Sequence, residues 1–300
     1  MTDPTAQALR ALDALLAEDP GGRGIARFRP RDALGPAAQA LRQAARAAIV
    51  TGFPRGDVGE TDGPPGALAL GLALEAAGVP VVHVTDERDA PLLRALGAAP
   101  LEVACLPAGD AGNHERARRL LERLDATHLV SIERPGRAAD GTYRNMRGLD
   151  ISARTSALDE LFLVAREEGP WRRRTVCVGD GGNEVGMGLV AARVAATVDH
   201  GQVIASIVPC DHLVVAGVSN WGAYGLVAAL SLLAGRDLLP TPDDARAHVA
   251  RIVAAGAVDG VTGRAEVTVD GLPIERTLDL LEALRRVLRA TRRRGGASRA

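Results

Sequence analysis

The chain has 300 residues, of which 47% are hydrophobic, and its 37 acidic and 36 basic residues give a formal net charge of -1. This length allows a substantial buried core, and a charge so close to zero favours a small-molecule substrate over a nucleic acid or an anionic membrane as partner. All the basic residues are arginines, and without lysine neither a Schiff base, as in pyridoxal phosphate (PLP) enzymes, nor a standard P-loop can form.

The first part of the chain predicts an amphipathic helix over residues 1–19, rich in alanine and leucine. It lacks the charge pattern of a signal or transit peptide, and no apolar run in the sequence reaches membrane-spanning length. Three cysteines, widely spaced and without a C-x-x-C pair, fit a reducing compartment. We therefore expect a cytoplasmic protein, either a monomer or a homo-oligomer.

Beyond a glycine- and arginine-rich connector at residues 21–31, short β-branched runs alternate with longer helical patterns. The predicted strands are residues 47–51, 79–85, 101–106, 128–132, 175–178 and 203–208. The predicted helices between them include residues 66–77, 89–97, 114–124, 156–168 and 188–198. Such alternation is typical of βαβ units, so we expect an α/β fold with a mostly parallel sheet flanked by helices.

The last part of the chain departs from this alternation. Residues 265–270 alternate apolar and polar side chains before an Asp270-Gly271 turn, which predicts a small antiparallel addition near the C-terminus. The final segment, TRRRGGASRA at residues 291–300, predicts a disordered basic tail. Because no linker or internal repeat interrupts the rest, we expect a single α/β domain over residues 1–290.

Glycine-rich loops follow several of the predicted strands, and ligands of parallel α/β sheets bind at the carboxyl ends of the strands. The loops read GFPRGDVGETDGPPG after Thr51, ERPGRAADGTYRNMRGLD after Ile132, GDGGNEVGMG after Val178 and PCDHLVVAGVSNWGAYG after Val208. Glycines allow backbone N–H groups to approach a ligand closely. We therefore expect these loops to form one site.

The acidic residues of these loops are the candidate functional groups. They are Glu60, Asp62, Glu133, Asp140, Asp180, Glu184 and Asp211. Carboxylates gathered in one cleft repel each other unless they are protonated or bind a metal, and hard oxygen ligands favour Mg²⁺ or Mn²⁺. The expected metal ligands are Glu60, Asp62, Asp180 and Glu184. For any one acid, capping a helix is an equally good interpretation, most of all for Asp62 and Asp180.

Residues 186–191 satisfy the dinucleotide-binding pattern G-x-G-x-x-A. In that motif the glycines begin directly after the strand, whereas here Asp180 and Glu184 come first and would lie beside a pyrophosphate. Repulsion between these charges argues against NAD as a cofactor.

Five long segments carry a more specific signal. They are ETDGPPGA at 60–67, IERPGRAADGTYRNMRGLDIS at 132–152, GDGGNEVGMG at 179–188, SNWGAYGL at 219–226 and VDGVTGRAEVTVDGLP at 258–273. Together and in this order they resemble the D-glutamate cyclase-like family, the C-terminal domain of D-glutamate cyclase. The resemblance implies a carbon–oxygen lyase, a hydro-lyase that converts D-glutamate to 5-oxo-D-proline and water.

Closing D-glutamate into a lactam requires a deprotonated amine, an electrophilic side-chain carboxylate and the loss of water, and these needs suggest roles for the loop residues. Glu133 is the expected proton shuttle, with Asp140 and Asp211 as further catalytic candidates. Arg134 or Arg144 would hold the α-carboxylate. The other substrate-binding candidates are Asn145, Gly181, Gly182, Asn183 and Asn220. Two other functions fit the same residues: a metal-dependent hydrolase acting on a phosphate or an amide, and a non-catalytic binding protein for an acidic metabolite.

Overall fold

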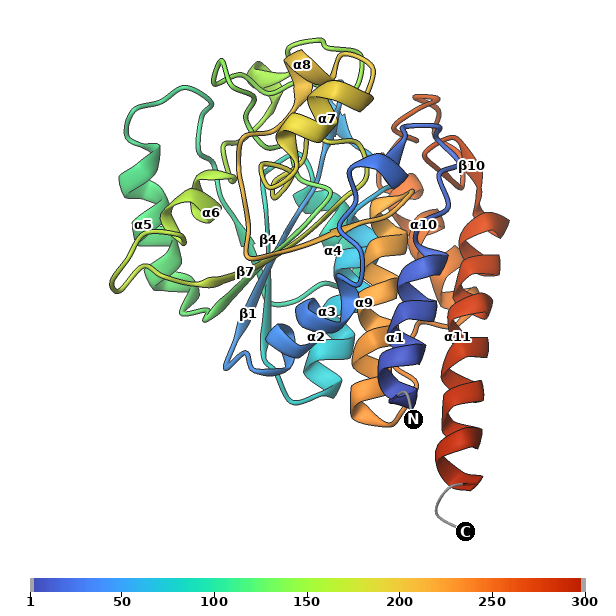
Figure 1. Cartoon of the computed structure of the whole chain (residues 1–300). Coiled ribbons are helices and arrows are strands. Elements are labelled where there is room, and N and C mark those ends of the chain that lie inside the picture. Colours follow the sequence, from blue (N-terminus) through green and yellow to red (C-terminus); the bar gives the residue numbers. More distant parts are fainter. Residues whose placement is uncertain (1–2, 298–300) are drawn as a thin grey trace.

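A six-stranded sheet forms the centre of the computed structural model, which describes residues 3–297, with side chains as far as residue 293 (Figure 1). In spatial order its strands are β5 (Leu101–Val103), β4 (Val81–Thr85), β1 (Ala47–Thr51), β6 (His128–Ile132), β7 (Arg174–Gly179) and β8 (His212–Val215). Every neighbouring pair in this sheet is parallel. The predicted α/β fold is confirmed, and the bounds of β1 and β6 are the predicted ones.

The strand order places a reversal of the winding between β1 and β6. From β1 the chain proceeds to β4 and β5 on one side, and it then returns to β6 and continues to β7 and β8 on the other. The loops that leave the carboxyl ends of β1 and β6 therefore run in opposite directions. A crevice opens between such loops, and it is the usual ligand position in this kind of sheet.

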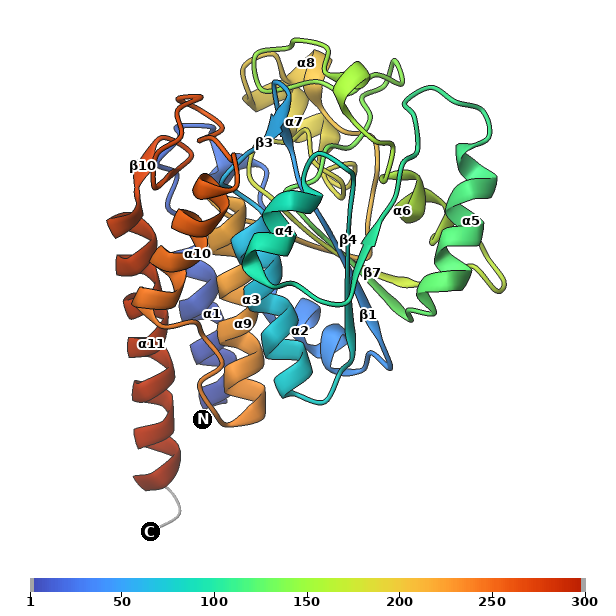
Figure 2. The ribbon, with the colours of Figure 1, turned by 180° about the vertical axis from the view of Figure 1, so that it is seen from behind.

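Helices cover both faces of the sheet (Figures 1 and 2). One face carries α1 (Pro4–Leu15), α2 (Leu34–Arg42), α3 (Pro64–Ala76), α9 (Ser219–Ala234) and α11 (Ile274–Ala297). The other face carries α5 (Asn113–Leu124), α6 (Glu160–Val164), α7 (Ala191–Thr197) and α8 (Gly201–Ile204). The remaining helices are α4 (Ala90–Leu96), which packs on α10 (Pro242–Ala254), and the single turns η1 (Ile25–Arg27) and η2 (Ser152–Arg154).

Burial on both faces explains the continuous apolar runs of the strands. In β1, Ala47 and Ile49 belong to the core beneath α3 and α9, while Ala48 and Val50 belong to the core beneath α5 and α6. A strand with two buried faces needs no polar side chain in its middle, which is why these segments read as unbroken apolar runs. Helices α3 and α9 pack against each other in the centre of their layer and are themselves largely buried.

The strand predicted at residues 203–208 is wrong. This segment begins within α8 and continues as an extended segment, and the sixth strand of the sheet is β8, further along the chain. Val203 and Ile207 are 45% and 47% exposed, whereas Ile204 and Val208 are buried in the core. A short apolar run does not by itself distinguish a buried strand from a helical turn on the surface of the core.

The end of the chain contains the predicted antiparallel addition. Strands β9 (Thr268–Val269) and β10 (Leu272–Pro273) pair around the Asp270-Gly271 turn, and a second hairpin joins β2 (Pro54–Arg55) to β3 (Val58–Gly59). Helix α11 runs to Ala297, within the segment expected to be a tail. Residues 298–300 of that segment lie outside the described residues, and the domain and tail boundaries stay a prediction. Within residues 3–297, none of the helices combines the length and the apolar character that crossing a bilayer requires.

Candidate active site

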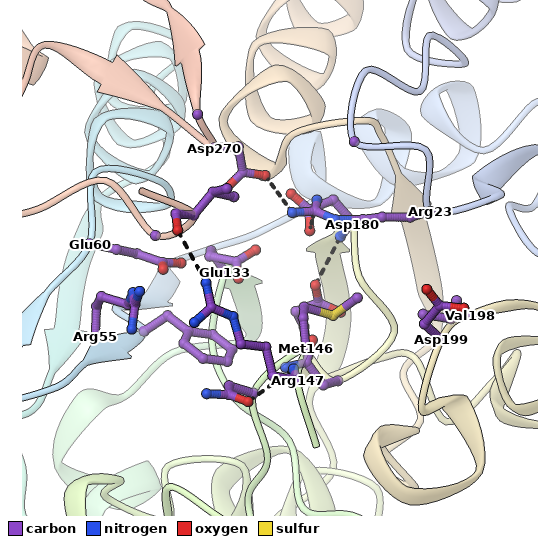
Figure 3. Close-up of a pocket in the computed structure, with 18 of the residues that line it drawn as sticks. Arg23, Arg55, Glu60, Glu133, Met146, Arg147, Asp180, Val198, Asp199 and Asp270 are labelled. Carbon is purple, nitrogen blue, oxygen red and sulfur yellow. Dashed lines mark hydrogen bonds and ion pairs between the residues drawn. The ribbon is translucent and has the colours of Figure 1, made fainter. Parts of the chain in front are cut away.

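A cavity of about 590 Å³ lies at the carboxyl edge of the sheet, in the crevice between the β1 and β6 loops. Figure 3 shows acidic and arginine side chains around this one space, although they come from segments far apart in the chain. The acids that line it are Glu60, Glu133, Asp180, Glu184, Asp199 and Asp270, and the arginines are Arg23, Arg55 and Arg147. The loops after β1, β6 and β7 therefore converge as expected.

Three buried carboxylates, from Asp62, Glu133 and Asp180, lie close enough for one oxygen of each to be within 4.8 Å of the others. Asp62 is held by the N-terminus of α9. One of its oxygens accepts the N–H groups of Gly63 (3.0 Å) and Asn220 (2.8 Å), and the other accepts the N–H of Ser219 (2.9 Å). The free N–H groups at a helix N-terminus carry partial positive charge, so α9 stabilises negative charge at this point.

Glu133 follows directly after β6 and adopts a left-handed backbone conformation, with φ of 44°. Its Oε2 accepts a hydrogen bond of 2.5 Å from the hydroxyl of Ser219. The backbone of Gly63 passes so close that a Cβ on this glycine would lie 2.8 Å from the Cβ of Glu133. A glycine is therefore required at position 63 for the β1 loop to approach Glu133.

Asp180 follows directly after β7 and is the one of these three acids that pairs with an arginine. Its Oδ1 lies 2.6 Å from a guanidinium nitrogen of Arg23, and its Oδ2 accepts the Ser219 N–H at 3.1 Å. The same Arg23 contacts Asp270 at 2.8 Å. The connector after α1 and the β9–β10 turn are thus joined to the end of β7 through a single arginine (Figure 3).

Glu184 stabilises the loop after β7, in which it lies. Its oxygens accept the backbone N–H groups of Asp180 (3.1 Å), Gly181 (2.6 Å) and Gly182 (2.7 Å). A carboxylate that accepts three N–H bonds from its own loop fixes the backbone that carries Asp180. Glu184, Gly181 and Gly182 therefore shape the site.

Glu60 is buried beside the cavity and its carboxylate makes no hydrogen bond or ion pair with any residue that the structure describes. Burial, followed by the charges of Asp270 and Asp62, raises the pKa of Glu60 well above its ordinary value. A carboxyl group with a raised pKa binds a proton more readily than an ordinary one, and an oxygen without a partner is free to receive it, which suits proton transfer.

We call Glu60, Asp62, Glu133 and Asp180 together the acidic cluster. The pKa of every member is shifted upwards. Burial is the first cause for every member; it raises the pKa of Asp62 to about 7 and the pKa values of Glu133 and Asp180 well above the ordinary carboxyl range. The neighbouring carboxylates add to the shift, while Arg23 opposes it at Asp180. Several carboxyl groups with raised pKa in one cavity are typical of a catalytic site.

Two of the predicted catalytic acids lie away from this cavity. Asp140 is exposed in a turn, where it accepts hydrogen bonds from Thr142 and pairs with Arg144. Asp211 precedes β8 instead of following a strand, so it lies at the amino edge of the sheet and binds Arg172 and the N–H of Thr175. The error for Asp211 follows from the wrong strand at residues 203–208.

The two arginines predicted to bind substrate are also elsewhere. Arg134 is fully buried. Its guanidinium group pairs with Asp86 at 2.8 Å and donates hydrogen bonds to the carbonyls of Gly52 and Ser156. Arg144 pairs with Asp140 and the carbonyl of Gly148.

The predicted asparagines are distributed between the cavity and its support. Asn145 and Asn183 line the cavity, and the side chain of Asn183 donates to the carbonyl of Arg144. Asn220 is buried and accepts the N–H groups of Gly63 and Gly66, so it connects the starts of α3 and α9. Asn220 is therefore a support of the site and not part of its lining.

Besides Asp199, four charged cavity residues were absent from the sequence predictions: Arg23, Arg55, Arg147 and Asp270. Each lies in a short glycine-containing segment, GGRG, PRGD, MRGL and VDGL respectively. The glycine-rich pattern that selected the acids could have selected these residues as well, but the pairing of Arg23 with Asp180 joins segments whose contact no local pattern indicates.

The donor set of Asp62, Glu133 and Asp180 fits a hard divalent cation. All three offer carboxylate oxygens, which are the ligands that Mg²⁺, Mn²⁺ and Ca²⁺ prefer. Arg23 is the one guanidinium paired with the acidic cluster among the described residues, so carboxyl groups are in excess over cationic partners there. A cation would relieve that excess.

Together the doubly wound sheet and the acidic cavity at its carboxyl edge define an α/β protein with an enzyme-like site. The sequence model of the family described as D-glutamate cyclase-like, C-terminal matches residues 12–285, and the chain belongs to that family. The human protein named D-glutamate cyclase, mitochondrial is 36% identical over 312 residues, which cover 90% of this chain and 50% of the human protein. The chain thus spans about half the length of that relative.

Several chains in solved structures are also similar to this chain. One of them is an exopolyphosphatase-related protein from Bacteroides fragilis, with a TM-score of 0.41 and 8% sequence identity over 86% of this chain and 57% of that one. This likeness is too low to inform the function.

Proposed function

We propose that this protein is a lyase that closes D-glutamate to 5-oxo-D-proline with release of water. Membership of the D-glutamate cyclase-like family supports the reaction. The observation that carries the proposal is the free, buried carboxyl group of Glu60, which has a raised pKa and faces a cavity containing both acids and arginines.

The reaction forms one bond and breaks one. The amine nitrogen bonds to the side-chain carboxylate carbon, and one oxygen leaves that carbon as water. Two protons move from the ammonium group to the departing oxygen, so the net charge of the substrate is unchanged. The protein must therefore accept a proton near the amine and return one near the leaving oxygen, which a carboxyl group with a raised pKa can do.

We assign the proton transfer to Glu60 and cation binding to Asp62, Glu133 and Asp180. This exchanges the roles first expected of Glu60 and Glu133, because Glu133 lies within the group of three acids and Glu60 does not. The hydroxyl of Ser219 orients Glu133, and the N-terminus of α9 supports the charge of Asp62. A divalent cation bound here would polarise the substrate's side-chain carboxylate.

The proposal is tested by incubating the purified chain with D-glutamate and, separately, L-glutamate, after treatment with EDTA and after addition of Mn²⁺. Chiral chromatography follows 5-oxoproline. We expect conversion of the D-enantiomer, loss with EDTA and recovery with Mn²⁺. The Asp180→Asn variant should lose activity, while Asp140→Asn, a matched change outside the cavity, should keep it. Conversion of neither enantiomer, or hydrolysis of a chromogenic phosphate instead, would overturn the proposal.

A further inference from the structure

Arg55 and Arg147 differ from the third arginine of the cavity in having no carboxylate partner. Arg23 pairs with two acids. Arg55 makes no side-chain hydrogen bond or ion pair within residues 3–297, and its Nε is buried without a partner. The side chain of Arg147 makes one long contact, 3.5 Å from Nη2 to the carbonyl oxygen of Val261. Both guanidinium groups are thus available to a ligand.

Local structure aims each of these two arginines at the cavity. Arg55 lies on β2, in the hairpin formed by β2 and β3, where it pairs with Val58. Arg147 lies in a turn built by Asn145, whose side-chain oxygen accepts the N–H groups of Arg147 (3.0 Å) and Leu149 (3.1 Å). This turn gives Asn145 a positioning role in place of the substrate contact first expected of it.

The two side chains reach the same loop, between α10 and β9. Arg147 contacts Val261, and Nη2 of Arg55 lies 3.2 Å from the point that a Cβ on Gly263 would occupy. Gly263 has φ of +70°, a conformation that favours glycine. Figure 3 shows both arginines among the residues around the cavity, together with the acids Glu60 and Glu133.

The cavity therefore has two chemically distinct parts: the acidic cluster, and the arginine pair formed by Arg55 and Arg147. Two cations directed at one loop without a counter-ion repel each other, and an anion between them removes that repulsion. The planar, forked guanidinium group matches a carboxylate in two parallel hydrogen bonds. The acids cannot provide this partner from inside the protein, because they form no ion pair with either arginine.

We infer that Arg55 and Arg147 bind the α-carboxylate of an amino-dicarboxylic acid, with its amine and side-chain carboxylate directed to the acidic cluster. This inference rests on the proposed function, in which the α-carboxylate takes no part in bond making. The arginine pair then decides which acidic substrates are accepted. A substrate whose α-carboxylate is replaced by a neutral amide loses the charge that both arginines recognise.

The test uses the full chain with Mn²⁺ and the variants Arg55→Gln, Arg147→Gln and the double variant. Arg264→Gln is the matched control, since Arg264 lies in the same loop but is exposed and does not line the cavity. Steady-state kinetics compare D-glutamate with D-isoglutamine, its α-carboxamide. Each single variant should raise KM for D-glutamate about 10–100-fold, with a smaller change in kcat. The double variant should lose the preference for D-glutamate over D-isoglutamine, and the control should match the wild type.

Calorimetry separates failure of this inference from failure of the cyclase proposal. D-glutamate and 5-oxo-D-proline are titrated into the wild type and into each variant. If the wild type binds these ligands without turnover, and the arginine variants bind at least about tenfold more weakly than Arg264→Gln, the carboxylate site stands while the cyclase proposal falls. If the arginine variants bind and discriminate as the wild type does, or if the wild type binds neither ligand, the inference is overturned.

Discussion

Two groups of buried charged residues in this protein differ in how their charges are paired. In the first, Asp159 accepts bonds from the Nε (2.7 Å), Nη2 (3.0 Å) and backbone N–H (3.1 Å) of Arg137 and from the hydroxyl of Tyr143 (2.5 Å), and Arg137 also pairs with Glu160. Both oxygens of Asp159 are satisfied. This network fastens the long loop after β6 to the start of α6, and each of its charged groups has an oppositely charged partner.

The acidic cluster is the unmatched counterpart. Its four carboxyl groups are buried, like Asp159, yet Arg23 is their one cationic partner among the described residues, and Glu60 has none. Burial of charge without a partner costs free energy, and a fold retains such a group only where something else requires it. The difference teaches that burial alone does not distinguish a structural acid from a functional one; the balance of partners does.

The largest expected effect comes from removing the unpaired acid. The Glu60→Gln variant should lower kcat about 10²–10⁴-fold, the usual contribution of a general acid–base group. The raised pKa of Glu60 costs the native state stability at pH 8, where the unfolded side chain is ionised. Gln carries no such cost, so the melting temperature should rise by about 2–4 °C for each kcal/mol relieved. Assays and thermal melts are compared with Glu115→Gln, an exposed glutamate on α5. Retained turnover would remove Glu60 from the mechanism.

The network around Asp159 should respond in the opposite way, because a change there should lower the stability of the fold. The Asp159→Ala variant leaves Arg137 and Tyr143 without their shared acceptor, and breaking a buried pair costs about 3–5 kcal/mol. Urea unfolding measures the loss. The exposed pair of Glu115 and Arg119 provides the contrast, since Glu115→Ala should cost no more than about 1 kcal/mol. Equal losses of stability in the two variants would mean that the network contributes no more to the fold than an exposed ion pair does.

The pH dependence of cation stabilisation sharpens the same contrast. The pKa of Asp62 is raised to about 7, above the unfolded value of about 3.9. Between these values the cation-free native protein holds protons that the unfolded chain has released, so its stability falls as pH rises, and above about pH 7 the loss is complete.

A cation displaces those protons, so the stabilisation by Mn²⁺ over EDTA should increase between pH 4 and pH 7, by about 1.4 kcal/mol per pH unit for each proton displaced. Paired melts in Mn²⁺ and in EDTA across this range measure the difference, in which groups unaffected by the cation cancel. A difference that does not change with pH would argue against cation binding at Asp62, Glu133 and Asp180.

The smallest effect is expected for the single partner of the cluster. The Arg23→Gln variant removes the charge that pairs with Asp180 and Asp270, and in EDTA it should lose about 1–3 kcal/mol. Mn²⁺ should restore most of that loss, because the cation supplies the missing positive charge. Arg276→Gln, which breaks an exposed pair with Glu18, should show no such rescue. A loss in Arg23→Gln that Mn²⁺ leaves unchanged would show that Arg23 acts independently of the cluster.

The fold was predictable where the local signal is strong. The apolar runs of β1 and β6 are bounded by polar or glycine residues. The loops after β1, β6 and β7 carry Glu60, Glu133 and Asp180 to the crevice by the general rule for parallel sheets. The same rule failed for Asp211, because the apolar residues 203–208, which begin within α8, had the pattern of a strand. Roles that depend on partners were beyond the sequence: Glu184 and Asp180 lie four residues apart in one loop, yet one binds backbone N–H groups and the other an arginine from residue 23.

The contact between Asp62 and the start of α9 has a consequence for how the protein is assembled. The Asp62 carboxylate and the Ser219 N–H are separated by 157 positions in the chain, so a folding intermediate that has formed β1 and β6 but has not yet docked α9 lacks the groups that hold Asp62 in place. Contacts of such long range form late, since closing the loop between them costs entropy first. A cation would then bind tightly to the completely folded chain and only weakly to a partly folded one.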